Sequence, residues 1–515
     1  MINIYDHAAR APGRPAIILA DTGESVSYGE LAKRVSRLSH LLLQSGLKRG
    51  DHFAVAMENN VYWAEVLFAA LHSGMQMVPV NRYLTAAEIA YIVRDSDSKA
   101  LISSDTMSET MAGLKDEDIP DCPIKFMIGK PIPGWLSYDK LVAEQPDTPL
   151  EKRWMGGFMP YSSGTTGQPK GIIRPLPDIT VDKAGPAEMQ RNMWLHYFPG
   201  DSVFFTPAPI YHSSPINWLR YVLFDGGTFV TTKKFDAEAC LAIVARYGVT
   251  HSFWVPTMFI RLLRLPDEVR QQYDLSSLCV VMHAGAPCPA DVKAAMIEWL
   301  GPLIVEFYGA TETARISICL SHEALAKPGT VGRPTEVHIC DEEGREVPVG
   351  TIGQIYAPVS PFEYYGDPEK TARAHHPAHP NWATAGDIGY VDEDGYLFLT
   401  DRQAFMIISG GVNIYPQIIE NALAFHPDIE DVAVIGVPDD DLGEIVKAVI
   451  QPRGGGSPEL AENIMVFLRE RVGRYMLPRS IDFVDELPRL ASGKLHKVVL
   501  RSRYANKVTE NPNAA

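Results

Sequence analysis

A stretch rich in hydroxyls and glycines, YSSGTTGQPKGI at residues 161–172, has the residue types that bind phosphate. Glycines let the backbone curl so that successive N–H groups face one anion, while hydroxyls and an ammonium add donors and positive charge. The Walker pattern G-x-x-x-x-G-K-[ST] is not met, because Pro169 precedes the lysine and Gly171 follows it, so a P-loop NTPase is disfavoured. A flexible surface loop is the simpler alternative. We expect a polyphosphate-binding loop with these donors: Ser162, Ser163, Gly164, Thr165, Thr166, Gly167 and Lys170.

Four further motifs follow this loop along the chain. They are YGATET at residues 308–313, AGDIGYVDEDGYLFLTDR at 385–402, ISGGVNIYP at 408–416 and RLASGK at 489–494. Together with SSGTTGQPKG, these motifs resemble, in order and approximate spacing, those of the adenylate-forming superfamily of acyl-CoA synthetases, peptide-synthetase adenylation domains and firefly luciferase. The resemblance covers essentially the whole chain. It implies an AMP-forming carboxylic acid–CoA ligase that uses ATP, Mg²⁺ and coenzyme A.

The YGATET motif would hold the nucleotide and the metal ion. The resemblance implies that Tyr308 stacks on adenine beside Gly309 and that Thr311 binds phosphate. It also implies that Glu312 and Thr165 bind Mg²⁺, a hard cation that suits a carboxylate bridging to phosphate oxygens. Taken alone, a Tyr-Gly turn followed by Thr and Glu is more typical of a helix N-cap.

Three further segments complete the expected nucleotide and acyl site. Asp387 would accept hydrogen bonds from the ribose hydroxyls and Arg402 would donate to them, although a turn residue is the alternative for Asp387. His212 would lie near the reacting carboxylate, and a histidine that only packs in an aromatic loop is its alternative. After the apolar run LCVVM, the resemblance places three residues along adenine and the floor of the acyl pocket: Gly285, Ala286 and Pro287.

Lys494 in LASGKLHK is the expected catalytic lysine. A lysine after a flexible Ser-Gly turn can reach into a neighbouring domain and stabilise charge on the carboxylate and the α-phosphate. In the superfamily the small domain then rotates by a large angle. The resemblance therefore implies that Gly410 and Gly411 replace Lys494 and flank the channel for the pantetheine arm of coenzyme A.

Several positions depart from the superfamily pattern. Ala385 stands where T-G-D has its hydroxyl, with Thr384 one residue earlier, and Val412 replaces the glutamate of S-G-G-E-N. Ala404 and Phe405 stand near the hinge, where charged residues are common. These changes put the stabilisation of the hinge in question and leave the other expected site residues intact.

Hydrophobic periodicity predicts the strands and helices that must carry these residues. Short apolar runs alternate with helix-length periodic segments, which predicts α/β layers with largely parallel strands. Between residues 329 and 400, strands separated by Gly and Asp-Gly turns predict a β-meander or a small β-barrel-like subdomain. The remaining residues suffice for a small α+β domain. We expect an N-terminal AMP-binding domain at 1–402 and a mobile C-terminal lid domain at 403–515.

Composition limits the partners and the location. The 515-residue chain has 47 Lys plus Arg against 63 Asp plus Glu, a net charge of −16, without a run of five like charges. This argues against nucleic acid or an anionic membrane surface as the main partner. The six cysteines form no C-x-x-C pair, and charged residues occupy the place of a signal-peptide core. We expect a cytoplasmic protein with reduced thiols. A homodimer is possible on the sequence alone.

The longest apolar stretch, VYWAEVLFAALHSGMQMVPV from Val61, is interrupted by Glu65 and His72. Its unbroken apolar length falls short of the ~18–20 residues that a membrane span needs. It predicts a buried amphipathic helix and no integral membrane segment.

The residues expected around the acyl group are apolar and aromatic, without an Arg to pair a second carboxylate. We therefore expect a hydrophobic acid, of fatty, alicyclic or steroid type or aromatic, and a role in fatty acid metabolism. A stand-alone adenylation enzyme that passes the acyl group to a carrier protein or another acceptor is the alternative. A non-catalytic nucleotide sensor is disfavoured by Glu312 and Lys494. The candidate walls are Tyr211, Asn217, Trp218, Tyr221, Phe253, Trp254 and Ala310.

Overall fold

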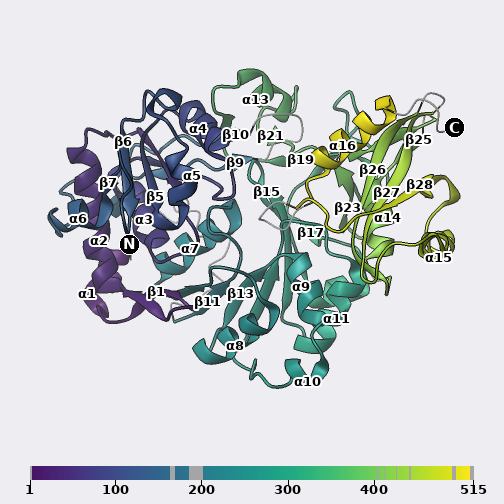
Figure 1. The fold of residues 1–515 in the computed structure, drawn as a ribbon, viewed down its shortest axis with the longest axis horizontal. Helices are drawn as coiled ribbons and strands as arrows, with labels where there is room; N and C mark the ends of the chain where they lie inside the picture. The colour runs from purple at the N-terminus through teal and green to yellow at the C-terminus, as the bar shows by residue number, and fades with distance from the viewer. Residues whose placement is uncertain are drawn as a thin grey trace.

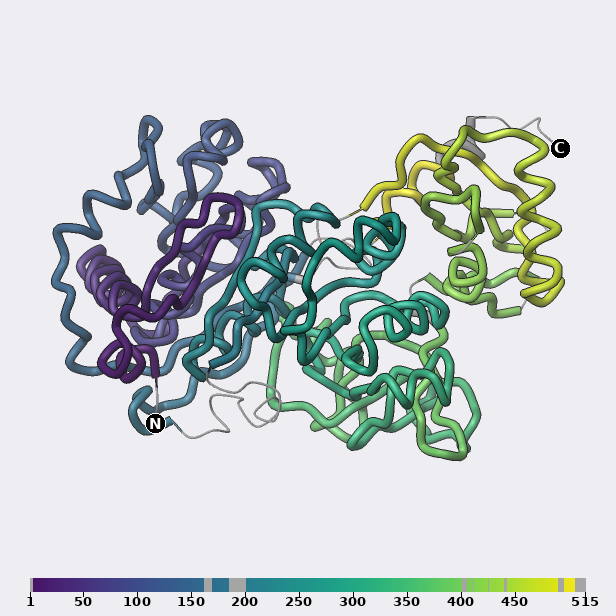
Figure 2. Tube along the Cα trace, turned by 90° about the horizontal axis from the view of Figure 1, so that it is seen from below, coloured from purple at the N-terminus to yellow at the C-terminus, as the bar shows by residue number. Residues whose placement is uncertain are grey.

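The computed structural model describes residues 3–162, 169–184, 201–402, 405–410, 412–424, 426–439, 442–489 and 495–510. Layers of helices and sheets form a large N-terminal part, and a smaller α+β unit forms the C-terminal part (Figure 1). In the view of Figure 2 this C-terminal unit lies at one end of the molecule. The expected fold class is confirmed.

The first layer is a parallel sheet of six strands in the order β7-β6-β5-β3-β4-β8. Helices separate most of its strands along the chain, as crossovers between parallel strands usually require, although β7 follows β6 without one. The strands are β3 (His52–Ala56), β4 (Gln76–Pro79), β5 (Ser98–Ser104), β6 (Ile124–Ile128), β7 (Leu136–Ser137) and β8 (Gly157–Phe158). The helices of this region are α1 (Ile4–Arg10), α2 (Tyr28–Gln44), α3 (Tyr62–Ser73), α4 (Ala86–Asp95), α5 (Ser108–Ala112) and α6 (Tyr138–Ala143).

The second layer is a sheet of nine strands in the order β17-β16-β15-β14-β13-β11-β12-β1-β2, parallel from β15 to β1 and antiparallel at its edges. Its strands are β1 (Pro15–Leu19), β2 (Glu24–Ser27), β11 (Val203–Thr206), β12 (Thr228–Thr231), β13 (His251–Trp254), β14 (Val280–His283), β15 (Ile304–Ala310), β16 (Ala314–Leu320) and β17 (Arg333–Pro334). The helices here are α7 (Ser213–Asp225), α8 (Ala237–Tyr247), α9 (Pro256–Leu263), α10 (Asp267–Arg270), α11 (Ala290–Leu300) and α12 (Ser321–Ala326).

Helix α3 packs against α7 and joins the two layers in one core. The rings of Phe68 and Phe224 lie 5.1 Å apart across this contact. The helix is buried, as predicted, but it is not amphipathic, because even Glu65 and His72 are buried. Burial raises the pKa of Glu65 to about 7. The hydrogen bond from Tyr138 and the charge of Arg34 lower this pKa but only partly offset the effect of burial. Burial also lowers the pKa of His72 to about 3.

Two smaller antiparallel sheets follow. A three-stranded sheet has β9 (Tyr161–Ser162), β10 (Lys170–Ile173) and β20 (Glu363–Tyr364) in the order β20-β10-β9. Beyond residue 329, the predicted meander is confirmed as a five-stranded sheet, and helix α13 (Pro368–Ala374) lies within this segment of the chain. Its strands are β18 (His338–Cys340), β19 (Gly353–Pro358), β21 (Trp382–Ala383), β22 (Asp387–Val391) and β23 (Leu397–Arg402).

The C-terminal unit has its own core around a long antiparallel pair, β26 and β27. Helix α14 begins with Pro416 at its first position, as predicted. Arg264 after α9 forms an ion pair with Glu430 and so connects the N-terminal part with this unit. The elements are β24 (Ile407–Ser409), β25 (Val412–Ile414), α14 (Pro416–Leu423), β26 (Ile429–Asp439), β27 (Gly443–Pro452), α15 (Pro458–Arg469), β28 (Ser480–Phe483) and α16 (Lys497–Glu510).

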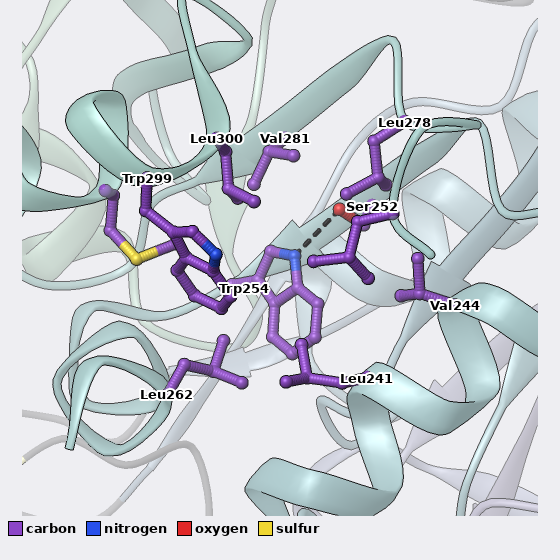
Figure 3. Close-up of a pocket in the computed structure, with 11 residues that line it drawn as sticks. Leu241, Val244, Ser252, Trp254, Leu262, Leu278, Val281, Trp299 and Leu300 are labelled. Carbon is purple, nitrogen blue, oxygen red and sulfur yellow. Dashed lines mark hydrogen bonds between the residues drawn. The ribbon is translucent and has the colours of Figure 1, made fainter. Parts of the chain in front are cut away.

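A small apolar pocket lies in the second layer (Figure 3). Trp254 lines it, and its indole N–H donates to Ser252 Oγ at 2.8 Å. Side chains alternate between the two faces of a strand, so Phe253 points to the opposite face and packs near Trp218 and Phe307. Trp254 therefore does not share one acyl pocket with Phe253, and this part of the predicted wall is wrong.

Among the helices of the described ranges, none combines the length and the apolar character that crossing a membrane requires.

Candidate functional site

The residues on either side of the phosphate loop form an antiparallel pair. Ser162 lies opposite Lys170, and Tyr161 lies opposite Gly171. The middle of the loop falls outside the described residues, and with it five of the expected donors: Ser163, Gly164, Thr165, Thr166 and Gly167. What the structure places is therefore the base of the loop.

Asp95, the last residue of α4, anchors this base. Its Oδ1 is 2.7 Å from Lys170 Nζ, and its Oδ2 accepts a hydrogen bond from the Tyr161 hydroxyl at 2.9 Å. The Tyr91 hydroxyl contacts both Asp95 Oδ1 and the carbonyl of Pro169 at 3.1 Å. The hydrogen bond to Asp95 raises the pKa of Lys170, and burial raises that of Tyr161. The two sides of the loop base are thus held by one carboxylate, which the sequence did not suggest.

The YGATET motif forms the end of a β-hairpin, so the helix N-cap alternative is wrong. β15 and β16 are antiparallel, with Gly309 opposite Arg315 and Ala310 opposite Ala314. A Cβ on Gly309 would lie 1.9 Å from the carbonyl oxygen of Ala314, so only glycine fits there. The turn places Thr311 Oγ1 3.1 Å from the hydroxyl of Ser213 at the start of α7.

Arg174, directly after β10, connects the phosphate hairpin with this turn. Its Nη2 donates to the carbonyl oxygens of Thr311 and Glu312, each at 2.9 Å. On the other side of the turn, Tyr364 of β20 donates to Glu312 Oε1 at 2.7 Å. Since β20 pairs with β10, both contacts come from the sheet that carries the phosphate loop. Two motifs that lie far apart in the sequence therefore form one site.

Tyr308 and Asp387, the residues expected at the nucleoside, contact each other. The Tyr308 hydroxyl donates to Asp387 Oδ2 at 2.9 Å, and both residues are buried, at 9% and 8% exposure. Asp387 lies opposite Arg402 in the ladder between β22 and β23. The structure therefore brings together the three residues expected at adenine and ribose.

The segment expected along adenine is the loop that follows β14. Gly285 has a φ of +88°, a conformation that glycine adopts without strain. Gly285 and Pro287 are exposed, while Ala286 is half-buried. Because β14 and β15 are neighbouring parallel strands, their carboxyl ends bring this loop to the same edge of the sheet as Tyr308.

A buried ion pair supports this edge from below. Lys293 of α11 pairs with Glu306 of β15, and its Nζ also donates to the carbonyl of Thr330 at 3.1 Å. Burial opposes the charge of Lys293, but Glu306 outweighs it and raises the lysine pKa. His283 lies beside the pair, and burial holds its pKa well below the usual range. The pair fixes α11 against the strand that carries Tyr308.

His212 is the N-cap residue of α7, and its ring lies 4.4 Å from that of Tyr211. The following residue, Ser213, contacts Thr311, so His212 is placed beside the expected phosphate residues. On the same helix, Asn217 Nδ2 donates to the Ser213 carbonyl at 2.8 Å, while its buried Oδ1 has no hydrogen-bond partner among the described residues. Within the same part of the chain the buried Tyr211 hydroxyl has none either. This part of the predicted acyl wall is therefore less apolar than its composition indicated.

Of the residues expected from the C-terminal motifs, Gly410 is described and Gly411 and Lys494 lie outside the described residues. Gly410 has a φ of +57°, and its N–H donates to the carbonyl of Leu442 at 2.8 Å. Near Lys494, Arg489 pairs with Leu495 and donates to Asp431 with its Nε at 2.6 Å. The assignment of Lys494 stays a prediction.

The hydroxyl of Thr384 is already used within the protein and does not take the place of the one missing at Ala385. Its Oγ1 accepts a hydrogen bond from the backbone N–H of Gly386 at 3.0 Å, and Gln354 donates to it at 3.3 Å. The side chain is buried, at 5% exposure. The hydroxyl stabilises the turn before Asp387, whose Gly386 has a φ of +79°.

Glu312 fits the expected Mg²⁺. Among described residues, only Tyr364 donates to its carboxylate, at Oε1, which leaves Oε2 available. Mg²⁺ is usually held by one or two carboxylates and the substrate's phosphates, so a cluster of protein ligands is not required. Within the described ranges no group of three His, Cys, Asp or Glu could hold a metal ion. The other expected ligand, Thr165, lies outside those ranges.

The N-terminal α/β layers, the antiparallel sheets, the nucleotide-type site and the small C-terminal unit together define the class of adenylate-forming enzymes. The sequence matches the family model of the AMP-binding enzyme at residues 4–358 and that of the AMP-binding enzyme C-terminal domain at residues 418–494. This chain therefore belongs to the AMP-binding enzyme family.

Relatives cover nearly all of the chain. It is 34% identical to a feruloyl-CoA synthase of an Amycolatopsis species, over 94% of both chains. It is 31% identical to the fatty acid–[acyl-carrier-protein] ligase ScoC of Streptomyces coeruleorubidus, over 97% of this chain and 95% of that one. The crystal structure of the anthranilate CoA ligase AuaEII with anthranoyl-AMP superposes with a TM-score of 0.86 at 26% identity, over 99% and 98% of the chains. The predicted class, a carboxylic acid–CoA ligase, is confirmed.

Proposed function

We propose that this enzyme joins a hydrophobic carboxylic acid to the α-phosphorus of ATP, releases pyrophosphate, and transfers the acyl group from the acyl-adenylate to coenzyme A. The acid would be fatty, alicyclic or steroid-type, or aromatic. The observation that carries the proposal is the pair of hydrogen bonds from Arg174 to the carbonyls of Thr311 and Glu312. They join the phosphate hairpin to the turn that holds the expected phosphate and metal residues.

The first half-reaction brings two anions together, so charge neutralisation and alignment must supply the catalysis. Asp387, held by Tyr308, would orient the ribose and so fix the α-phosphate relative to Thr311. Glu312 would hold Mg²⁺, which neutralises phosphate charge when bound. Lys494 would stabilise charge on the carboxylate and the α-phosphate. His212 lies where the carboxylate would approach, at the start of α7.

The aromatic side chains of α7 and the adjacent strands support a hydrophobic acid. Trp218 packs against Phe204, Phe253 and Phe307, with ring centroids 5.7 to 6.3 Å apart. The relatives act on acids of this kind, since their names specify feruloyl, fatty acid and anthranilate substrates. Such acids fit the proposed place in fatty acid or aromatic acid metabolism.

The second half-reaction would use the C-terminal unit as a lid. We place the boundary between residues 402 and 403, after β23, so that the unit can rotate and bring Gly410 and Gly411 to the pantetheine channel. We also propose a cytoplasmic location, which the six free thiols support.

Transfer to a carrier protein is the alternative, favoured by the similarity to an acyl-carrier-protein ligase. Pyrophosphate release should be measured over a panel of fatty, alicyclic and aryl acids, with coenzyme A, with a phosphopantetheinylated carrier protein, and with neither. Turnover that requires coenzyme A supports the proposal, and turnover only with the carrier protein supports the alternative. If no acid of the panel gave acid-dependent pyrophosphate release, the proposed activity would be wrong.

A further inference from the structure

Lys370 is a cation of this site that no motif of the sequence identified. It lies on α13, which follows β20, the strand that pairs with β10 of the phosphate hairpin. Figure 1 shows α13 next to β10. Tyr364 of β20 lies opposite Ile172 of β10, and the next residue, Tyr365, donates its backbone N–H to the carbonyl of Gly171 at 2.8 Å. Helix α13 is therefore held beside the base of the phosphate loop.

The ammonium of Lys370 lies close to the expected metal residue. Its Nζ is 4.2 Å from the centroid of the Tyr364 ring, and the hydroxyl of the same ring donates to Glu312 Oε1 at 2.7 Å. Lys370 is half-buried. Among described residues, no carboxylate oxygen lies within 4.0 Å of its Nζ. A partly buried ammonium that contacts an aromatic face, with no carboxylate this close in the described part of the chain, is incompletely compensated.

Charges of both signs surround Lys370. Burial lowers the pKa of Lys370. The negative charges of Glu312 and Asp367 raise this pKa, and the positive charges of Lys170 and Arg373 lower it. Asp367 is the N-cap of α13, and its side chain accepts a hydrogen bond from the backbone N–H of Lys370. The carboxylate of Asp95 already holds Lys170. Lys370 has no such carboxylate partner among the described residues, so a polyphosphate at the base of the loop would supply the anion that Lys370 lacks.

We propose that Lys370 binds the β- and γ-phosphates of ATP and, after the first half-reaction, the pyrophosphate that leaves. This proposal deepens the proposed function and rests on it. A purely structural role for Lys370 is the competing explanation, because its stem also covers the Tyr364 ring. A lysine that only packs would lose little when its charge is removed and its stem is kept.

The test compares three variants of the full chain. K370M keeps an unbranched stem and removes the charge, K370R keeps the charge, and E369A changes the exposed neighbour on the same helix. Binding of ATP and of inorganic pyrophosphate with MgCl₂ should be measured by calorimetry, together with the KM for ATP in acid-dependent exchange. Thioester formation from supplied acyl-adenylate and the thermal midpoint serve as further readouts.

For K370M we expect pyrophosphate and ATP to bind about tenfold more weakly and the KM for ATP to rise about as much, which is the scale of one charge-assisted contact. K370R should stay within about threefold and E369A within about twofold of the wild type. Thioester formation and the thermal midpoint should not change. Unchanged pyrophosphate affinity in a folded K370M would overturn the assignment. Because calorimetry needs no acid, this result is independent of whether the proposed acid activation is found.

Discussion

The proposed nucleoside end and the proposed phosphate end of the site are built differently. At the nucleoside end, Tyr308 and Asp387 are nearly fully buried and already hydrogen-bonded to each other. At the phosphate end, Lys170 keeps 22% of its side chain exposed and Lys370 is half-buried. Adenosine is neutral, so fixed groups suit it, whereas a triphosphate needs cations around it. We therefore expect changes at the phosphate end to weaken ATP binding, the chemical step or both, and changes at the nucleoside end to weaken ATP binding at nearly constant kcat.

The largest effect is expected for K494A. Loss of the main charge stabiliser should reduce acyl-adenylate formation at least ~10²-fold, while thioester formation from supplied acyl-adenylate continues. The two half-reactions should be measured separately, by pyrophosphate exchange and by thioester formation. An equal loss in both would show that this lysine does not belong to the phosphate end.

A somewhat smaller effect is expected for E312Q. The neutral amide binds Mg²⁺ less well, so kcat/KM should fall about tenfold to a hundredfold, and half-maximal activity should require more Mg²⁺. The Tyr364 hydroxyl can still donate to the amide oxygen, which preserves the turn. A titration of MgCl₂ at saturating ATP measures the shift, and an unchanged Mg²⁺ requirement would contradict the metal assignment.

The anchor of the phosphate loop can be tested with D95N. Loss of the ion pair with Lys170 should loosen the loop base and raise the KM for ATP about tenfold, the scale of one or two hydrogen bonds to a charged group. D116N is the control, because it breaks the ion pair with Lys125 away from the site. If both variants behaved alike, Asp95 would not have a specific role.

At the nucleoside end, Y308F should have a small effect. It removes the hydroxyl that orients Asp387 and keeps the ring that would stack on adenine, so the KM for ATP should rise about threefold to tenfold at nearly constant kcat. Steady-state kinetics with varied ATP provide the measurement. A fall in kcat as large as that of E312Q would remove the distinction between the two ends.

A buried carboxyl outside the site, Glu65, should affect stability and leave activity unchanged. Its folded pKa of about 7 lies above the unfolded value, so the folded state binds the extra proton and stability falls as pH rises. Relative to E65Q, the wild type should lose about 2–3 kcal/mol of unfolding free energy between pH 5 and pH 8. Urea unfolding at both pH values measures the difference, and parallel pH profiles would contradict it.

The motifs were recognised in the sequence and the α/β layers were predicted from it, because both depend on local patterns of residues. The alternation of apolar runs predicted the two α/β layers, and Gly and Asp-Gly turns predicted the antiparallel sheet. The sequence pattern failed for Trp254, since neighbours in a strand face opposite sides of the sheet. It predicted the burial of α3 but missed that a helix between two sheets is buried on its polar positions too. The roles of Asp95, Arg174 and Lys370 were not predicted, because a single charged residue has no pattern of its own.

What the sequence by itself determined is the family, the order of the motifs and the chemistry of their side chains, since motif residues are close neighbours along the chain. Tertiary structure alone decided which side chains of the site come into contact. Tyr308 reaches Asp387, Lys170 reaches Asp95 and Tyr364 reaches Glu312 only through the pairing order of strands. That order depends on the packing of the whole core, and a local pattern of residues does not specify it.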